Sequence, residues 1–173
     1  MSILDILRVT QLYPLDAVDV DVDVDEFVPL RFRTYREPLG VGYVRLGNYS
    51  TTLVEMAVEP RTQVVRGLTV TSICDMSPWP FFDIFEVMEG LPALATSFEG
   101  GEVLDLQRDF MVAIRPREIV VFWKSLDRCR GSKFRNICFL IAEDMLAGVW
   151  FTNLTEKETQ LFESHAVPSN LSH

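Results

Sequence analysis

The sequence contains few of the side chains from which common active sites are built. Among its 173 residues there are two histidines, His165 and His173, and both lie at the C-terminal end. A Ser-His-Asp or Cys-His set needs a histidine beside the nucleophile, and these positions make such a set difficult to assemble. The chain has no HExxH motif, no phosphate-binding glycine loop and no dinucleotide fingerprint. We therefore expect no enzyme, no catalytic residue, no metal ligand and no cofactor.

Cysteine is scarce too. Three cysteines, an odd number with no CxxC pair, indicate neither a disulfide framework nor a zinc site. Cys129 lies between Arg128 and Arg130, whose charges favour a reactive thiolate; the alternative is an incidental loop cysteine. Cys74 and Cys138 lie in apolar, strand-like surroundings, where cysteine behaves as a small core residue.

Long apolar runs and a secretory leader are also missing. The best candidate run, residues 137–142, is far short of the roughly 18 residues that a membrane helix requires. Asp5 and Arg8 interrupt the apolar start that a signal peptide needs. We expect a cytoplasmic protein that does not enter a membrane.

Positive charge is in the minority, with 16 Lys and Arg against 25 Asp and Glu and a net charge of −9. Nucleic-acid binding needs a basic surface, so we expect no nucleic-acid partner. The length suits one domain, and no repeat or linker divides the chain. We therefore predict that residues 1–173 form a single domain.

The local pattern is mainly that of β-strands. Residues 51–58 and 64–73 are rich in β-branched side chains and flank a turn that contains Pro60, which predicts a hairpin. The same reasoning predicts hairpins of residues 110–115 with 119–124 and of residues 136–142 with 147–152, and strands at residues 28–35 and 41–46. Residues 3–9 fit either a strand or a helix.

One helix is clearly signalled near the C-terminus. Thr155 can accept from the first turn while Glu158, three residues later, reaches back to it in a capping box. Leu154, Leu161 and Phe162 would pack this helix against a sheet. We predict a mainly β (α+β) protein, an antiparallel sheet or a β-sandwich or half-barrel built from hairpins, with a helix from about Thr155.

Charges of opposite sign are separated along the chain. Residues 67–107 contain no Lys or Arg and seven acids, and residues 9–30 contain none and six acids. Residues 124–135 instead carry a charge of +4, from five cations and Asp127. Separated fields of this kind steer oppositely charged partners toward a surface.

Residues 75–91 combine four aromatic side chains with acids. Two prolines around Trp79 disfavour a regular interior strand. Aromatic anchors ringed by acids suit an interface with a basic protein, although some of these rings would lie in the core. The candidate partner-binding residues are Asp75, Trp79, Asp83, Glu86 and Glu89.

Residues 18–25 repeat Val-Asp four times, so a strand would place all the valines on one face and all the aspartates on the other. The plain interpretation is an edge strand whose acids prevent aggregation. A contact with a basic partner and a calcium site are alternatives, although the glycine turn of an EF-hand is missing. The secondary candidate residues are Asp19, Asp21, Asp23 and Asp25.

Three segments resemble small immunity proteins of bacterial toxin systems, of the contact-dependent growth inhibition type. The segments are the hairpin LVEMAVEPRTQVVRGLTVTS, the strand VVFWKS and the closing AEDMLAGVWFTNLTEKETQLF. The resemblance implies a compact, often β-rich protein that binds one toxin domain and blocks its active site.

This resemblance and the charge pattern lead to one expectation. The chain would be an immunity protein whose acidic surface binds a cognate toxin domain, such as a nuclease with a basic active site. The alternatives are a carboxylate-dependent small hydrolase, since two placed acids suffice for glycoside hydrolysis, and a non-catalytic β-rich interaction or assembly subunit.

Overall fold

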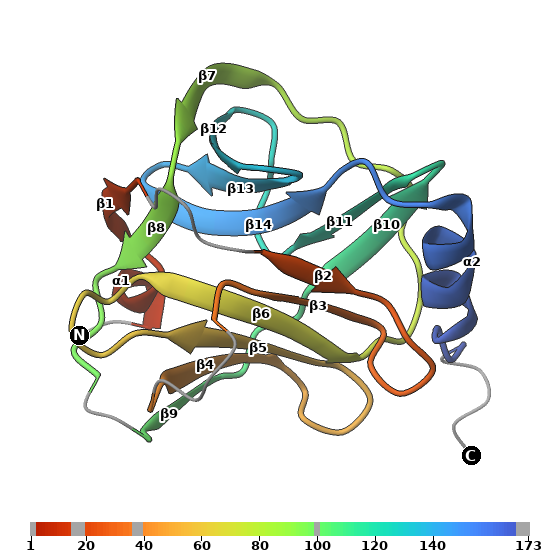
Figure 1. The fold of residues 1–173 in the computed structure, drawn as a ribbon, viewed down its shortest axis with the longest axis horizontal. Coiled ribbons are helices and arrows are strands. Elements are labelled where there is room, and N and C mark those ends of the chain that lie inside the picture. Colours follow the sequence, from red (N-terminus) through yellow and green to blue (C-terminus); the bar gives the residue numbers. More distant parts are fainter. Residues whose placement is uncertain (1–2, 15–19, 36–39, 99–100, 169–173) are drawn as a thin grey trace.

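Two six-stranded sheets pack face to face in the computed structural model, which describes residues 3–14, 20–35, 40–98 and 101–168 (Figure 1). The C-terminal sheet contains, in spatial order, β10 (Met111–Arg115), β11 (Glu118–Phe122), β14 (Met145–Phe151), β13 (Ile137–Ala142), β12 (Cys129–Phe134) and β7 (Ile84–Glu89). The N-terminal sheet contains β2 (Asp21–Asp23), β3 (Leu30–Arg33), β6 (Val65–Ser72), β5 (Leu53–Val58), β4 (Gly42–Gly47) and β9 (Val103–Leu106).

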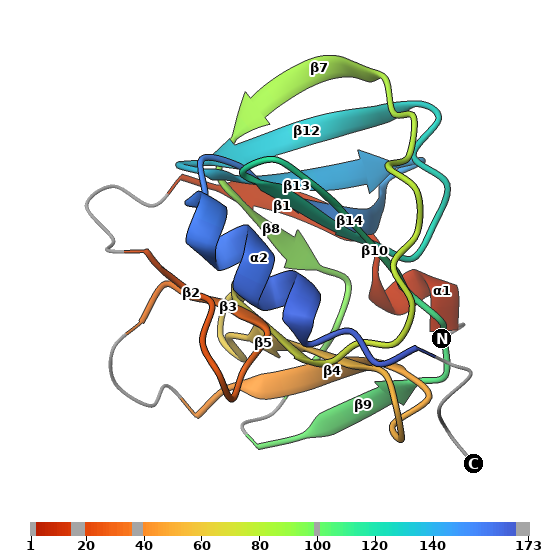
Figure 2. The ribbon, with the colours of Figure 1, turned by 90° about the vertical axis from the view of Figure 1, so that its right-hand side faces the viewer.

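Three further pieces close the open sides of this sandwich. A ribbon of β1 (Val9–Tyr13) and β8 (Leu91–Leu94) lies at one side, and α2 (Glu156–Ser164) lies at the opposite side (Figures 1 and 2). The short α1 (Ile3–Ile6) precedes β1, so the undecided N-terminal segment begins as a helix and continues into a strand.

One continuous core fills the space between the sheets. Phe32 from the N-terminal sheet meets Phe139 edge-on at 5.7 Å between ring centroids, and Phe151 at 6.1 Å. All three rings are fully buried. A core that draws large side chains from both sheets stabilises the sandwich by apolar burial and by aromatic packing.

The predicted mainly β fold is confirmed, and each predicted hairpin is present as an antiparallel pair. The third hairpin turns more tightly than expected. Glu143 and Asp144 both have positive φ, 51° and 62°, which is the backbone of a two-residue hairpin loop. The strand β14 therefore begins at Met145 instead of Ala147.

The predicted capping box of α2 is also confirmed. The backbone N–H of Glu158 donates to Thr155 Oγ1 at 3.1 Å, and the N–H of Thr155 donates to Glu158 Oε2 at 2.7 Å. Leu154 and Phe162 are buried and Leu161 is half-buried, so the apolar side of the helix contacts the sandwich.

The two sheets share one connectivity, a repeat that the sequence does not reveal. In each, a hairpin (β2–β3 or β10–β11) is followed by a three-stranded meander (β4–β5–β6 or β12–β13–β14) whose last strand pairs with the hairpin. The first meander strand then pairs in parallel with a strand from the other half of the chain, β9 with β4 and β7 with β12. This repeat lies in the backbone topology and has no matching side chains, so the sequence shows no repeat.

The correspondence extends to single residues. Gly67 in β6 lies between Arg33 and Ala57, and Gly148 in β14 lies between Phe122 and Leu140. In both sheets the register shifts at the next step of the meander. A bulge beside a glycine increases local twist, so the two sheets bend at the same place.

Candidate functional site

The strand β7 forms an exposed edge of the C-terminal sheet. Within the described part of the chain it pairs only with β12, in parallel, so its other side is open. Phe81, Phe85 and Val87 are 77%, 51% and 63% exposed. The acids of this segment are exposed as well. We call this surface the β7 edge: Phe81, Asp83, Phe85, Glu86, Val87 and Glu89.

The sequence explains how β7 is held in the sheet while most of its side chains stay exposed to solvent. Pro78 and Pro80 keep the preceding segment irregular, and the chain enters the sheet where the N–H of Cys129 donates to Asp83 O at 2.9 Å. Ile84 then packs into a second, smaller apolar cluster on the outer face of the C-terminal sheet. That contact holds β7 while the side chains that follow it face solvent.

Three basic side chains from residues 124–135 lie next to these acids. The linear charge pattern alone did not predict this placement. The residues opposite Glu86 and Glu89 are Arg130 and Lys133 of β12. The guanidinium of Arg128 lies over the Phe85 ring at 4.6 Å from its centroid. The expectation of separated charge fields is therefore wrong at the β7 edge, because parallel pairing of two distant segments places them side by side.

The neighbouring cations nevertheless pair with other acids. Arg130 binds Asp144, and Lys124 Nζ lies 2.6 Å from Glu143 Oε2. Among the described residues, no ion pair includes Asp83, Glu86 or Glu89. A cavity of about 470 Å³ adjoins Phe85, and Lys124, Arg128 and Glu143 are among its other lining residues. The β7 edge is thus an apolar strip with mixed charge around it.

Trp79 lies inside the second apolar cluster instead of on the surface. Its ring is half-buried, 6.2 Å from Phe82 and under the Arg115 guanidinium at 4.2 Å. Phe82 in turn meets Trp150 of β14 edge-on at 5.2 Å. Of the aromatic anchors considered, Phe81 and Phe85 are the accessible ones.

The structure divides the five candidate residues into three places. Asp83, Glu86 and Glu89 lie together at the β7 edge. Trp79 lies over the middle of the C-terminal sheet, and Asp75 lines a cavity beside β10, the opposite edge of that sheet. Residues 73–83 cross the outer face of the sheet between these edges, so sequence proximity here does not mean one surface.

Two aspartates of the Val-Asp segment, Asp23 and Asp25, have structural roles. The strand β2 is an edge of the N-terminal sheet, as predicted, with Val22 packed against the core. Asp23 Oδ2 accepts from Arg31 at 3.1 Å. Asp25 Oδ1 accepts from the N–H groups of Phe27 and Val28, and these bonds hold its pKa below the ordinary value.

Among the described aspartates of this segment, Asp21 alone makes no side-chain hydrogen bond or ion pair. Asp21 is exposed and lies opposite Arg33, and Asp19 lies outside the described residues. The secondary surface therefore offers a partner less than its four aspartates suggested.

The remaining candidate reactive groups are Cys129, which is buried, and His165, which contacts the backbone. Cys129 begins β12 and is fully buried. Its desolvation and, to a smaller extent, the negative charge of Asp83 raise the pKa of its thiol to about 11. Such a thiol stays protonated at neutral pH, which opposes the reactive-thiolate hypothesis. His165 Nε2 lies 2.6 Å from the backbone oxygen of Asp25, where it ties α2 to the β2–β3 loop.

A groove that the sequence did not predict runs along the outer edge of β10. It consists of two cavities of about 380 and 430 Å³ that share Met76 and Ser77. We call it the β10 groove; it takes residues from the β4–β5 loop, from the crossing segment, from β10 with the two residues before it, and from α2. These segments are far apart in sequence, so no spacing pattern could have indicated it.

In the described part of the chain, no helix is long and apolar enough to cross a membrane, and no group of three His, Cys, Asp or Glu is placed to hold a metal ion. The chain matches no protein-family model and no curated protein sequence.

Proposed function

We propose that this chain is an immunity protein that binds a toxin domain and neutralises it, with the β7 edge as the contact surface. The observation that carries the proposal is the exposure of Phe81, Phe85 and Val87 on one free strand edge. Exposed apolar side chains on an edge strand invite association, and folded proteins normally cover or charge such edges. A partner that covers this edge would remove the liability.

The chemistry of the edge suits a protein partner. Aromatic residues are the usual anchors of interfaces, and exposed rim charges set register and the rate of encounter. Glu86 and Glu89 can attract a cationic surface such as the active site of a nuclease, while Arg130 and Lys133 beside them restrict which surfaces fit. Mixed charge therefore favours one cognate partner over basic proteins in general.

Growth protection tests the proposal. The chain would be co-expressed with the toxin domain encoded beside its gene, and we expect it to restore growth and to co-purify with that domain. Phe85→Ala with Val87→Ser should speed dissociation and cost at least about 2 kcal/mol of binding free energy if these side chains are hot spots. The measurement is the dissociation rate from the immobilised toxin domain.

A matched control changes an exposed phenylalanine and an exposed valine elsewhere. Phe27 and Val103, 88% and 46% exposed, belong to the N-terminal half of the sandwich. Phe27→Ala with Val103→Ser should leave dissociation unchanged. Failure of the wild-type chain to protect or co-purify would overturn the proposal, and equal effects of both double variants would exclude the β7 edge as the contact. Protection without complex formation would favour an enzyme that destroys the toxin or its product.

A further inference from the structure

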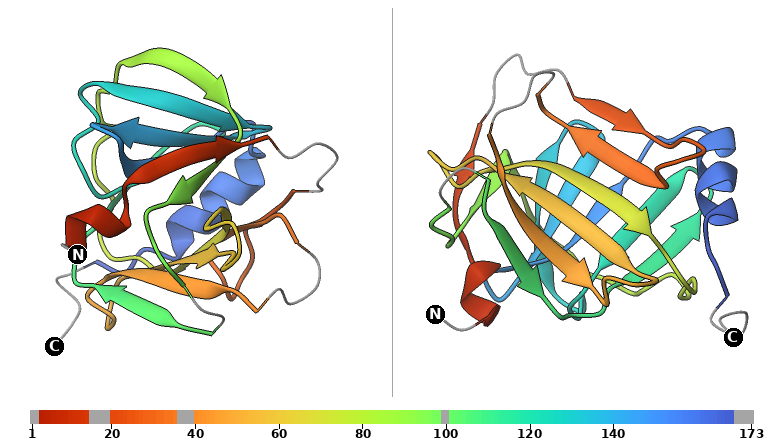
Figure 3. Two further views of the ribbon diagram at one scale, coloured as in Figure 1. Left: turned by 90° about the vertical axis from the view of Figure 1, so that its left-hand side faces the viewer. Right: turned by 90° about the horizontal axis from the view of Figure 1, so that it is seen from below.

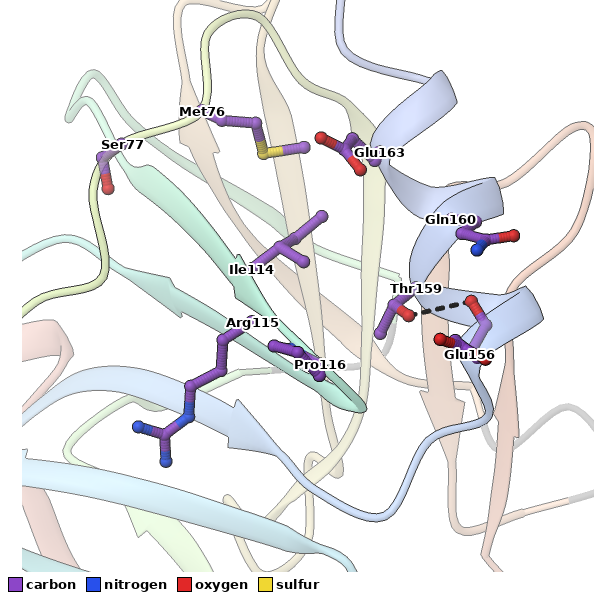
Figure 4. Close-up of a pocket in the computed structure, with 9 residues that line it drawn as sticks. All are labelled: Met76, Ser77, Ile114, Arg115, Pro116, Glu156, Thr159, Gln160 and Glu163. Carbon is purple, nitrogen blue, oxygen red and sulfur yellow. Dashed lines mark hydrogen bonds between the residues drawn. The ribbon is translucent and has the colours of Figure 1, made fainter.

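The β10 groove has an apolar floor and a rim of carboxylates. In the cavity between β10 and α2, Met76 and Ile114 lie at the centre, and Figure 4 shows the Met76 side chain directed toward the helix. Glu156 and Glu163 line the same cavity from α2. They are seven residues apart, so both project from one side of the helix, about 10 Å apart along its axis.

The second cavity continues the same pattern. It is lined by Asp75 and Asp109 together with apolar side chains, among them Ile73, Phe110 and Met111. Met111 is 48% exposed at this edge. The groove as a whole therefore combines apolar surface with four acids from three separate segments of the chain.

The one cation of the groove is already engaged. Arg115 forms an ion pair with Glu118 and stacks over Trp79 at 4.2 Å, and Figure 4 shows its side chain directed away from α2. Among the described residues, no ion pair includes Asp109, Glu156 or Glu163. Asp109, Glu156 and Glu163 thus keep their negative charge, unlike the acids of the β7 edge, where cations stand opposite Glu86 and Glu89.

We propose that the β10 groove binds an extended basic segment of the protein partner, with one arginine side chain in the cavity between β10 and α2. An arginine has an apolar stem and a charged head. The stem would lie on Met76 and Ile114 while the guanidinium reaches Glu156 or Glu163, where charge-assisted bonds are the strong ones. Charge complementarity selects this occupant over an acidic or purely apolar segment. The inference rests on the proposed function for the source of the segment.

A labelled peptide tests the groove without the toxin. The probe is fluorescein-Gly-Ala-Arg-Ala-Arg-Ala-Gly, and its control carries citrulline, a neutral side chain of nearly the same shape, in place of both arginines. Fluorescence anisotropy with the full chain should show binding of the arginine peptide and at least fivefold weaker binding of the citrulline peptide. Glu156→Gln with Glu163→Gln removes both carboxylates that the guanidinium can reach and should weaken binding of the arginine peptide about fivefold, as the loss of one exposed ion pair would.

The β7 edge supplies the matched control. Glu86→Gln with Glu89→Gln removes the same charge and should change peptide affinity by less than twofold. Met76→Ala should weaken binding too, although it removes no charge. Circular dichroism and thermal melting would check that each variant stays folded.

Each outcome decides the inference. Equal losses in the two glutamine pairs would show that the overall negative charge attracts the peptide, and the groove would then be no site. Equal binding of both peptides, or binding of neither, would also overturn it. These results are separate from the proposed function, because growth protection depends on the toxin and the anisotropy measurement does not.

Discussion

The two sheets have the same strand connectivity, but the outer face of the C-terminal sheet is apolar and covered, whereas that of the N-terminal sheet is polar and uncovered. On the C-terminal sheet, Cys138 and Trp150 lie beneath residues 73–83 and form an apolar cluster with Phe82 and Ile84. On the N-terminal sheet, the corresponding register positions are Glu55 and Thr69. No described segment covers that face, as the view from below shows (Figure 3).

A row of polar residues crosses the uncovered face. Asp23 binds Arg31 at one end, and Arg45 binds Asp105 at the other, with Nε 2.6 Å from Oδ1. Such exposed pairs contribute little to stability but keep a broad sheet face soluble. Connectivity alone therefore does not decide which face becomes covered; the side chains on the face and the path of the next segment decide it.

Residues 73–83, which cover this outer face, also contribute to both candidate surfaces, the β10 groove and the β7 edge. The crossing segment starts at the β10 groove and ends at the β7 edge, so one stretch of chain builds a site at each edge of the C-terminal sheet. Among the described residues no such segment crosses the N-terminal sheet, and its edge strands β2 and β9 carry the salt bridges of Asp23 and Asp105.

The largest expected effect comes from removing the outer cluster. Trp150 lies 5.2 Å from Phe82, and its Nε1–H donates to Glu118 Oε1 at 3.0 Å. Trp150→Ala should cost about 2–4 kcal/mol, because a large ring leaves a packed cluster. Thr69→Ala, at the equivalent register position of the uncovered face, should cost less than about 1 kcal/mol. Urea unfolding of both variants measures the difference, and similar costs would mean that the crossing segment stabilises nothing.

A smaller difference is expected between the equivalent glycines. A Cβ on Gly148 would lie 2.7 Å from Val121 O and 2.9 Å from Phe122 Cβ. Gly148→Ala should therefore cost about 1–3 kcal/mol, as overpacking does. A Cβ on Gly67 meets its nearest atom, Phe32 O, at 3.1 Å, so Gly67→Ala should be milder. Thermal melting of the pair would contradict this if Gly67→Ala proved the worse of the two.

The smallest expected effect on stability at neutral pH comes from the two buried cysteines of the covered face, Cys129 and Cys138. Burial raises the pKa of Cys138, like that of Cys129, to about 11. A thiol whose pKa is higher in the folded state stabilises the fold fully below the unfolded value of 9.0, and this contribution is lost as the pH rises toward 11. Stability should fall between pH 9 and 11, and Cys138→Ala should reduce that fall.

Thiol labelling provides the matching kinetic readout. At pH 8 we expect native Cys74, which is half-buried, to react first and the two buried thiols to react only on unfolding. Rapid labelling of Cys129 in the native state would contradict the burial of this face.

The hairpins and the helix were predictable because their signals are local. Alternating or β-branched runs on either side of a turn, and a capping box that spans four residues, need no information from distant segments. The candidate site was predictable only in part. The acids and rings of residues 75–89 are surface features at Asp83 and Phe85, whereas Trp79 is half-buried against the outer apolar cluster of the C-terminal sheet.

Two of the strands that sequence reasoning missed, β7 and β12, share a physical cause. The strand β12 carries Arg130 and Lys133, and β7 carries exposed Phe85 and Val87, so neither shows a clean alternation. Each forms because the two pair in parallel across a long stretch of chain, and such pairing leaves no local signature.

The sequence by itself determined the fold class, the hairpins, the capped C-terminal helix and the net acidity, because each depends on neighbours in the chain. The tertiary structure alone decided where charge is balanced. It placed Arg130 and Lys133 beside Glu86 and Glu89, and it brought Asp109, Glu156 and Glu163 to one groove around Met76. Electrostatic interaction depends on distance in space, and only folding converts a sequence of charges into a surface.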